Sequence, residues 1–345
     1  MAGSRIPYVE GRATQPAALE RVAAHLAARL AVLGSEGGAL ASCSRPVFVG
    51  IGASYAALAL PLEMLASGGV LARREMAGEI GSGIEFTGAD LVIGVSQSGR
   101  SPETIDALAL VPRERRAAVV NVVPSRLGDS VAHRLDLGDE PDSYASTIGY
   151  TATLMALAMM ARTMLGRPAG EVAAEWSGIG PALVRHETAL APVVDQVARL
   201  AENVVAADVV ASGAARSASE SGALLLREVC RVPSSALVTR NYLHGEMESA
   251  GGTLHVVVGD GREVELARSL AGAGHLTLCV TSAAVDPGGH LHVVPIPGDA
   301  PLPVRTLLQT LVMQRLAGSM AEVRGVEIED FVFDNTDTKI EEPVG

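Results

Sequence analysis

The stretch DLVIGVSQSGRSPET, residues 90–104, decides the predicted fold. An apolar run typical of a buried strand ends at Ser96, and Ser101-Pro102 then begins a helical pattern. Pro is favoured at the first position of a helix and Ser just before it as the cap. The turn between strand and helix therefore presents hydroxyls and backbone N–H groups at the positive end of a helix. Such a turn can hold a phosphate group with neutral donors, although an ordinary Ser/Gly-rich turn has the same composition.

The same alternation of short apolar runs and Ala/Leu-rich helical stretches extends along the chain in two passages. The first passage predicts strands at 46–51, 90–96 and 117–123, helices at 55–67 and 102–110, and a long closing helix at 143–166. Pro and Gly residues predict a break at 166–181. The second passage predicts strands at 208–213, 253–259, 275–281 and 290–296, with helices at 216–230, 262–272 and 303–323.

Apolar strands separated by helices indicate a parallel sheet that is covered on both faces. We therefore predict an α/β protein with two pseudo-repeated domains, each a doubly wound, mainly parallel five-stranded sheet with helices on both faces. The predicted divisions are an N-terminal helical segment at 1–30, domains at 31–168 and 182–325, and a C-terminal tail at 326–345. Ligands of such sheets bind beyond the carboxyl ends of the strands, where the strand order reverses.

Composition excludes several classes of protein. A hydrophobic content of 48% with 19% charged residues describes a folded globular chain, and the net charge of −12 argues against a nucleic-acid partner. The N-terminus lacks the apolar core of a signal peptide, and the apolar run at 151–165 is too short and too interrupted to span a membrane. We therefore expect a cytoplasmic protein with no membrane partner. Its three cysteines are widely spaced and are expected to be buried and reduced.

Two other turns carry candidate ligand-binding hydroxyls. The sequence VGIGASYAA at 49–57 is a poor dinucleotide motif, because Tyr55 replaces the third glycine, but it leaves Ser54 at the mouth of the sheet. Ser146 and Thr147 stand near the start of the long helix, where capping the helix is the simpler role and ligand contact the alternative.

The tail contains the single lysine of the chain, Lys339, whereas the other basic residues are all arginines. A solvated residue near a terminus is the ordinary interpretation. Its isolation in an Arg-rich chain instead suggests a site that needs an amine, because Arg does not give up its proton.

GIGAS (50–54), SQSGRSPET (96–104) and YASTIGYT (144–151), in this order and spacing, resemble the SIS (sugar isomerase) family of phosphosugar-binding proteins. The resemblance covers essentially the whole chain. It is to the isomerase half of glucosamine-6-phosphate synthase and to stand-alone glucosamine-6-phosphate deaminases and ketosamine-6-phosphate deglycases. TQPAALERV (14–22) resembles the family's N-terminal helix, SGALLLREVC (221–230) its catalytic helix, YLHGE (242–246) its histidine turn, and TDTKIEEPV (336–344) its C-terminal tail.

The resemblance implies a role for each matching residue. It assigns Glu228 as the catalytic base, His244 as the ring-opening group supplied to the neighbouring subunit of a homodimer, and Lys339 as the residue that closes over the open-chain sugar, with Thr338 beside it. Phosphate binding falls to Ser96, Gln97, Ser98 and Ser101, and further substrate contacts to Ser54 and Ser146.

These residue types also fit the chemistry directly. Moving a proton between C1 and C2 of an open-chain sugar needs a carboxylate base, and ring opening suits His, whose ordinary pKa is near neutrality. A lysine amine can pair with the sugar oxygens or form a Schiff base with the carbonyl. Each residue also has a structural alternative: Glu228 as a surface ion-pair residue, His244 as a turn cap and Lys339 as a solvated tail residue.

The sequence departs from the family where Leu225 and Ile148 replace lysines, and loss of the first favours deamination or deglycation over aldose–ketose isomerisation. We therefore expect an enzyme that acts on an amino-sugar phosphate or ketosamine 6-phosphate and has no glutaminase domain. The alternatives are an aldose–ketose phosphosugar isomerase and a non-catalytic sugar-phosphate sensor. The expected ligand is a small sugar phosphate. No cofactor or metal is expected, and His290 and His292 are interpreted as structural.

Overall fold

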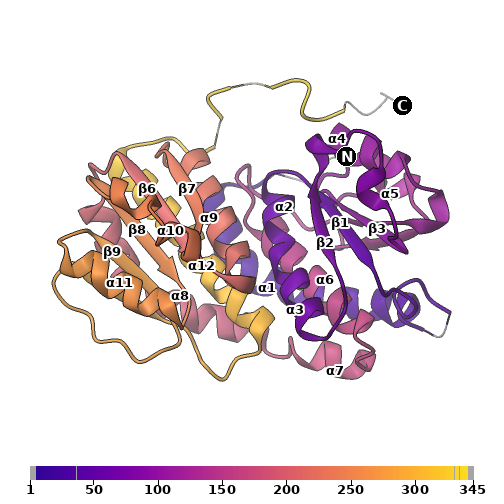
Figure 1. Cartoon of the computed structure of the whole chain (residues 1–345), viewed down its shortest axis with the longest axis horizontal. Helices are drawn as coiled ribbons and strands as arrows, with labels where there is room; N and C mark the ends of the chain where they lie inside the picture. Colours follow the sequence, from indigo (N-terminus) through magenta and orange to yellow (C-terminus); the bar gives the residue numbers. More distant parts are fainter. Residues whose placement is uncertain (1–4, 36, 330, 334, 341–345) are drawn as a thin grey trace. The chain divides into compact units, whose positions relative to one another are not determined.

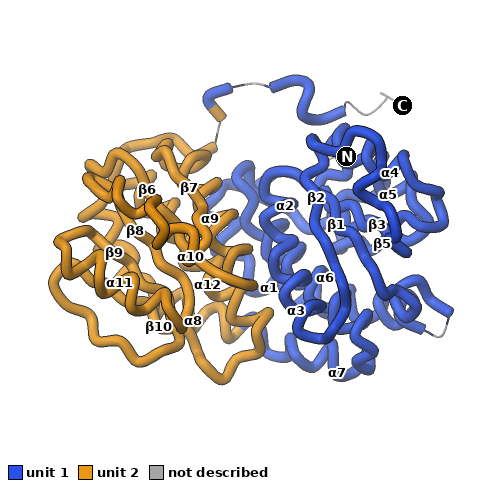
Figure 2. Tube along the Cα trace, viewed as in Figure 1, with its two compact units in different colours: residues 1–180, 332–345 blue, residues 181–331 orange. Residues whose placement is uncertain are grey.

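The computed structural model describes residues 5–35, 37–329, 331–333 and 335–340. The predicted N-terminal segment and tail therefore extend outside the described residues at 1–4, 330, 334 and 341–345. The chain divides into two units, which Figure 2 shows in different colours. Unit 1 comprises residues 1–180 and 332–345, and unit 2 comprises residues 181–331.

Unit 1 is built on a five-stranded parallel sheet with the strand order β2-β1-β3-β4-β5 (Figure 1). The strands are β1 (Pro46–Gly50), β2 (Arg73–Met76), β3 (Leu91–Val95), β4 (Arg116–Val120) and β5 (His133–Asp136). Every residue of β1 and β3 is buried, as expected for central strands with both faces covered.

Helices cover both faces of this sheet. On one face, α4 (Pro102–Ala109) and α5 (Arg126–Ser130) pack their apolar residues against alternate residues of the central strands. On the other face lie α1 (Tyr8–Leu33), α2 (Ala53–Ala57), α3 (Ala59–Ser67), α6 (Ile148–Met164) and α7 (Ala169–Ala174). Short 3₁₀ turns occupy Ala77–Glu79, Ile84–Phe86 and Arg113–Arg115. Almost every residue of α6 is buried, which explains why this helix is apolar on all sides.

A glycine lets α1 approach the start of α6 closely. A Cβ atom on Gly11 would lie 2.3 Å from the Thr147 hydroxyl, which itself bonds Ser143 at 2.9 Å and Asp142 at 3.2 Å. Nearby, the Gln15 amide on α1 donates to the Thr151 hydroxyl at 2.6 Å. The two elements are therefore joined by buried polar contacts that leave no room for a side chain at position 11.

Replacing Gly11 with Ala should destabilise the protein, although this exchange normally stabilises a helix. The added methyl must displace a hydrogen-bonded Thr147, which costs about 1–3 kcal/mol, against a gain of about 1 kcal/mol in helix propensity. Gly170→Ala in α7 is the matched control, because a Cβ atom there meets nothing within 4 Å. Thermal denaturation should show a lower Tm for the first variant and an unchanged or higher Tm for the second; a Tm rise in both would contradict the close contact.

Unit 2 repeats the same design. Its parallel strands are β6 (Ala206–Ala211), β7 (Ser234–Val238), β8 (Thr253–Val258), β9 (Thr277–Thr281) and β10 (Leu291–Pro295), in the order β10-β9-β8-β6-β7. Its helices are α8 (Ile179–Leu200), α9 (Arg216–Glu228), α10 (Thr239–Tyr242), α11 (Arg262–Gly272) and α12 (Leu302–Arg324). Further 3₁₀ turns occupy Gly213–Ala215 and Glu246–Ser249. α10 and α11 pack on one face, and α9 with α12 on the other.

Each sheet has the order 2-1-3-4-5 when its strands are numbered within its own unit, so the two sheets have one topology. The predicted fold class is confirmed: two pseudo-repeated, doubly wound α/β domains with five-stranded parallel sheets. Two local predictions were wrong. The break at 166–181 contains α7 and the first turn of α8, and the long helix begins at Ile148, not at residue 143.

All three cysteines are buried and none is disulfide-bonded, as predicted. Burial raises the pKa of the Cys230 thiol to about 11 and that of Cys279 to about 12. Within the described ranges, no helix has the length and apolar character needed to cross a bilayer.

Candidate functional site

The candidate site of unit 1 lies at the carboxyl ends of β1 and β3, where the strand order reverses. This switch point is where ligands bind in open α/β sheets. After β1 the backbone turns at Gly52, whose φ of +56° favours glycine, and Ser54 follows in α2 with its side chain half-buried. After β3 the chain enters the loop of residues 96–101, which we call the hydroxyl loop.

The hydroxyl loop is held by its own backbone and by its serines. The Ser96 N–H donates to the Val119 carbonyl at 3.1 Å, which continues the sheet, and Gly99 has a φ of +63°. The Ser96 and Ser101 hydroxyls lie 3.1 Å apart, and the Arg100 N–H donates to the Ser98 hydroxyl at 3.3 Å. Ser101 occupies the capping position of α4, but the predicted cap bond is absent, because its hydroxyl faces Ser96 instead.

Asp142 organises the start of α6. Its carboxylate accepts hydrogen bonds from the backbone N–H groups of Ser143 and Thr147, both at 2.9 Å, and from the Ser146 hydroxyl at 2.6 Å. The prediction that Ser146 and Thr147 cap this helix was therefore wrong: neither hydroxyl caps it, and the carboxylate four residues before Ser146 serves the helix end. Burial raises the pKa of Asp142, and the hydrogen bonds it accepts offset part of that rise.

Replacing Asp142 with Ala should unfold the protein at a clearly lower temperature. The change leaves buried N–H and hydroxyl donors without an acceptor, which costs about 3 kcal/mol in total at about 1–3 kcal/mol for each such group. Asp142→Asn keeps one acceptor oxygen and should lose less than half as much. Thermal denaturation of the two variants checks this order, and equal Tm losses would contradict it.

The C-terminal tail docks onto the hydroxyl loop. The Ile340 N–H donates to the Arg100 carbonyl at 3.0 Å, and the Arg100 Nε–H donates back to the Ile340 carbonyl at 2.8 Å. This reciprocal pair fixes the residue that follows Lys339. The Thr338 hydroxyl turns back to the Asn335 carbonyl at 2.9 Å.

A cavity of about 340 Å³ lies between the hydroxyl loop, the Asp142 segment and the docked tail. Four sequence-predicted residues line it: Gln97, Ser98, Ser146 and Lys339. The other predicted residues of unit 1 are not among its lining residues; they are Ser54, Ser96, Ser101 and Thr338. The remaining lining residues were not predicted and are Arg5, Arg100, Val122, Glu140, Asp142, Ser143 and Tyr144.

The charged groups of this cavity differ in whether a partner of opposite charge within the protein already binds them. Glu140 is buried and accepts two hydrogen bonds from Arg21, at 2.8 and 2.6 Å. Arg5, by contrast, is exposed, with its guanidinium 4.3 Å from the centre of the Tyr144 ring. Since the carboxylates are occupied by internal donors, the cavity presents arginine, lysine, amide and hydroxyl groups, which suits an anionic, oxygen-rich ligand.

The remaining predicted residues belong to unit 2. Glu228 is the last residue of α9 and is half-buried, and His244 lies exposed in the turn after α10. That turn is anchored by the buried Tyr242, whose hydroxyl donates to Asp208 at 3.0 Å and lies 3.0 Å from His255 Nδ1. Leu225 and Ile148, the positions where the resemblance expects lysines, are both buried.

The comparisons with known proteins agree with this fold. Residues 39–162 match the SIS domain family. No curated protein matches the sequence significantly. Many solved structures do match the chain, among them three proteins with different activities.

The C-terminal domain of glucosamine-fructose-6-phosphate aminotransferase from Francisella tularensis superposes with a TM-score of 0.74 at 17% identity, over 95% of this chain and 98% of that one. Glucosamine-6-phosphate deaminase from Thermotoga maritima gives 0.70 at 17% identity, over 94% and 97%. Tagatose-6-phosphate ketose/aldose isomerase from Escherichia coli gives 0.71 at 14% identity, over 91% and 92%. Residues 39–162 thus match the SIS domain, and over nearly its whole length the chain has the fold of these three proteins.

Proposed function

We propose that the protein is an enzyme of the phosphosugar isomerase type that removes an amine from an amino-sugar phosphate or a ketosamine 6-phosphate. The observation that carries the proposal is the cavity in which the hydroxyl loop meets Lys339 of the docked tail. This arrangement supplies donors for a phosphate and an amine for an open-chain sugar in one place. The likeness to a glucosamine-6-phosphate deaminase supports the same reaction class.

In the proposed mechanism, Ser96, Gln97, Ser98 and Ser101 hold the phosphate, with Ser54 and Ser146 as further contacts. Backbone N–H groups at the start of α4 add to this binding, because the helix end carries partial positive charge. His244 opens the sugar ring by moving a proton between the ring oxygen and the anomeric hydroxyl. His244 acts in the site of the neighbouring subunit, so a homodimer is part of the proposal.

Glu228 then moves one proton between C1 and C2. From an aldosamine it removes the C2 proton and returns it to C1, while one amine N–H proton passes to the C1 oxygen, so the C1 aldehyde becomes an alcohol and the C2 amine becomes an imine. Water adds to that imine, and the products are a ketose phosphate and ammonia. From a ketosamine the same step runs from C1 to C2, and hydrolysis of the C1 imine gives an aldose phosphate and the free amine. Lys339 pairs with the substrate oxygens, and Thr338 stands beside it in the tail.

Two features favour this reaction over simple aldose–ketose isomerisation. The positions of the two missing lysines, Leu225 and Ile148, are packed with apolar side chains, so no amine is available there to carry a hydroxyl proton. Glu228, His244 and Lys339 together still provide a base, a ring-opening group and an amine, which a sugar-phosphate sensor does not need. We also propose that this activity operates in the cytoplasm.

A substrate panel tests the proposal. The purified protein is incubated with glucosamine 6-phosphate, with 6-phosphates of fructosamine-type ketosamines and with amine-free hexose 6-phosphates, and released amine and product sugar are measured. Turnover of an amine-bearing substrate supports the proposal. Conversion of amine-free hexose phosphates alone indicates an isomerase, and tight binding without any turnover indicates a sensor; either result refutes it.

A further inference from the structure

A second cavity of unit 1, of about 420 Å³, lies at the opposite end of the same sheet from the hydroxyl loop. Its walls come from the last turns of α1, the 3₁₀ turn Arg113–Arg115 that precedes β4, the end of α5 and the first residues of β5. The strands are parallel, so their amino ends share one edge, and this cavity is set into that edge. We call it the amino-edge cavity.

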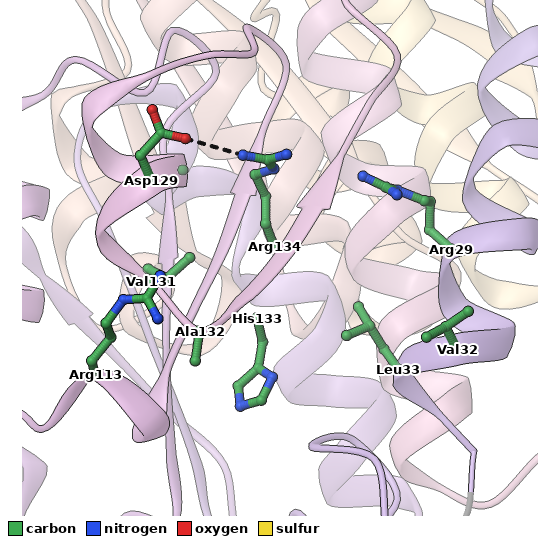
Figure 3. A pocket seen from close by; sticks show the side chains of 10 residues that line it. Arg29, Val32, Leu33, Arg113, Asp129, Val131, Ala132, His133 and Arg134 are labelled. Carbon is green, nitrogen blue, oxygen red and sulfur yellow. Dashed lines mark hydrogen bonds and ion pairs between the residues drawn. The ribbon is translucent and has the colours of Figure 1, made fainter.

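The amino-edge cavity is basic in a chain whose net charge is −12. Arg29, Arg113, Arg134 and His133 line it, and Asp129 is the one acidic residue among its described lining residues. Figure 3 shows Arg113 and Arg29 on opposite sides of the strand residues His133 and Arg134. Arginines approaching from three separate elements are typical of an oxyanion site, because the guanidinium fork matches phosphate and carboxylate geometry.

Only part of this positive charge is matched by carboxylates. Asp136 accepts two hydrogen bonds from Arg29, at 3.1 and 2.5 Å, and Asp129 accepts one from Arg134 at 3.1 Å. The Arg134 Nε–H is nevertheless buried without an acceptor. Arg113 is exposed, and its guanidinium has no hydrogen bond or ion pair with any residue that the structure describes. The exposed Arg113 guanidinium is therefore a donor of this cavity that a ligand can reach, and the Arg134 side chain adds positive charge beside it.

A glycine leaves room for the Arg134 side chain. A Cβ atom on Gly128 would lie 3.0 Å from Arg134 Cδ, so the arginine side chain lies across the bare backbone of α5. The rest of the lining is apolar, with Val32, Leu33, Val131 and Ala132, and Val32 is 71% exposed. A cavity of this size with one charged and one apolar part suits a small organic ligand.

We propose that the amino-edge cavity binds a phosphorylated organic molecule. Its phosphate oxygens lie against Arg113 and Arg134, and its apolar body covers Val32 and Leu33. The proposal is independent of the proposed enzymatic function and concerns a different end of the sheet. One contact joins the two regions, since the Leu127 N–H of α5 donates to the Gly99 carbonyl of the hydroxyl loop at 3.0 Å. For that reason the test variant is placed on Arg113, outside α5.

Isothermal titration of the full chain with ADP and with inorganic pyrophosphate, both without magnesium, tests the proposal. We expect ADP to bind at least about threefold more tightly than pyrophosphate, since only ADP covers the apolar lining. Arg113→Gln should weaken ADP binding about tenfold, through loss of a charge-assisted contact. Arg126→Gln is the matched control, because Arg126 is an exposed arginine of α5 that does not line the cavity. Its ADP affinity should stay within about twofold of the parent protein.

A third variant separates this cavity from the hydroxyl loop. Ser98→Ala removes a hydroxyl from the loop and should leave ADP binding unchanged, and saturating glucosamine 6-phosphate should not displace ADP. Loss of ADP binding in Ser98→Ala, or displacement by glucosamine 6-phosphate, would assign the ADP to the hydroxyl loop and overturn the proposal. Equal ADP affinity in Arg113→Gln and the parent protein, or no binding of either probe, would overturn it as well. None of the Arg113 outcomes depends on whether the protein turns over amino sugars.

Discussion

Glu228→Gln lowers kcat on the amine-bearing substrate about a thousandfold, within the 10²–10⁴ range of general base catalysis. Gln has almost the same shape as Glu but cannot accept the proton from C1 or C2. The affinity for the sugar phosphate stays within about threefold, because the hydroxyl loop that is proposed to bind the phosphate belongs to the other unit of the chain. Steady-state kinetics with product inhibition by hexose 6-phosphate measures both quantities.

Glu220→Gln provides the matched control for this prediction. Glu220 stands on the same helix, α9, where it accepts a hydrogen bond from Arg216 at 2.8 Å. The Glu220→Gln substitution removes one negative charge from the same helix and leaves the proposed base unchanged, so kcat should stay within about twofold. Full activity of Glu228→Gln would remove Glu228 from the mechanism, and equal losses in both variants would assign the effect to the helix as a whole.

Lys339→Arg lowers kcat about a hundredfold, although the positive charge is kept. The arginine remains protonated and presents a planar fork where the proposed site needs a compact amine. Asp337→Asn, an exposed substitution two residues earlier in the tail, should leave kcat within about twofold. Unchanged turnover in Lys339→Arg would show that the single lysine of the chain has no catalytic role.

Arg100→Gln separates the placement of Lys339 from its chemistry. The variant loses the Nε–H bond to the Ile340 carbonyl but keeps the lysine amine. The variant should raise KM and should lower kcat by about tenfold, which is less than the loss expected for Lys339→Arg. The loss is smaller because the Ile340 N–H still donates to the Arg100 carbonyl and holds the tail by one hydrogen bond. Limited proteolysis should cut the tail faster in Arg100→Gln, and an unchanged cleavage rate would argue against this docking contact.

The central strands of both sheets could be predicted from the sequence, whereas three edge strands could not. β1, β3, β6 and β8 are apolar runs covered on both faces, and this pattern is what identifies them. β2 (RREM), β5 (HRLD) and β7 (SSALV) lie at sheet edges, and their polar residues face solvent or neighbouring side chains. A prediction that relies on apolar runs in the sequence cannot identify such polar edge strands.

The candidate site was predictable where it depends on local motifs. The serines of the hydroxyl loop and Lys339 stand out in the sequence. Asp142 and Arg100 were missed. Asp142 accepts hydrogen bonds from residues one to five positions later, where the hydroxyls of Ser146 and Thr147 were expected to cap the helix, and Arg100 binds a tail residue 240 positions away. One signal was available for Asp142, since a carboxylate shortly before a long helix often binds that helix's free N–H groups.

Running the reaction in deuterium oxide tests the central claim most directly. The claim is that one carboxylate moves a proton between C1 and C2 and that an amine then leaves. We expect one equivalent of amine released per hexose phosphate formed. NMR should find deuterium on the receiving carbon, C1 or C2, in the turnovers in which the Glu228 carboxyl exchanges its proton with solvent before delivering it. Hexose phosphate formed without an equivalent of amine, or deuterium on a carbon other than C1 or C2, would contradict it.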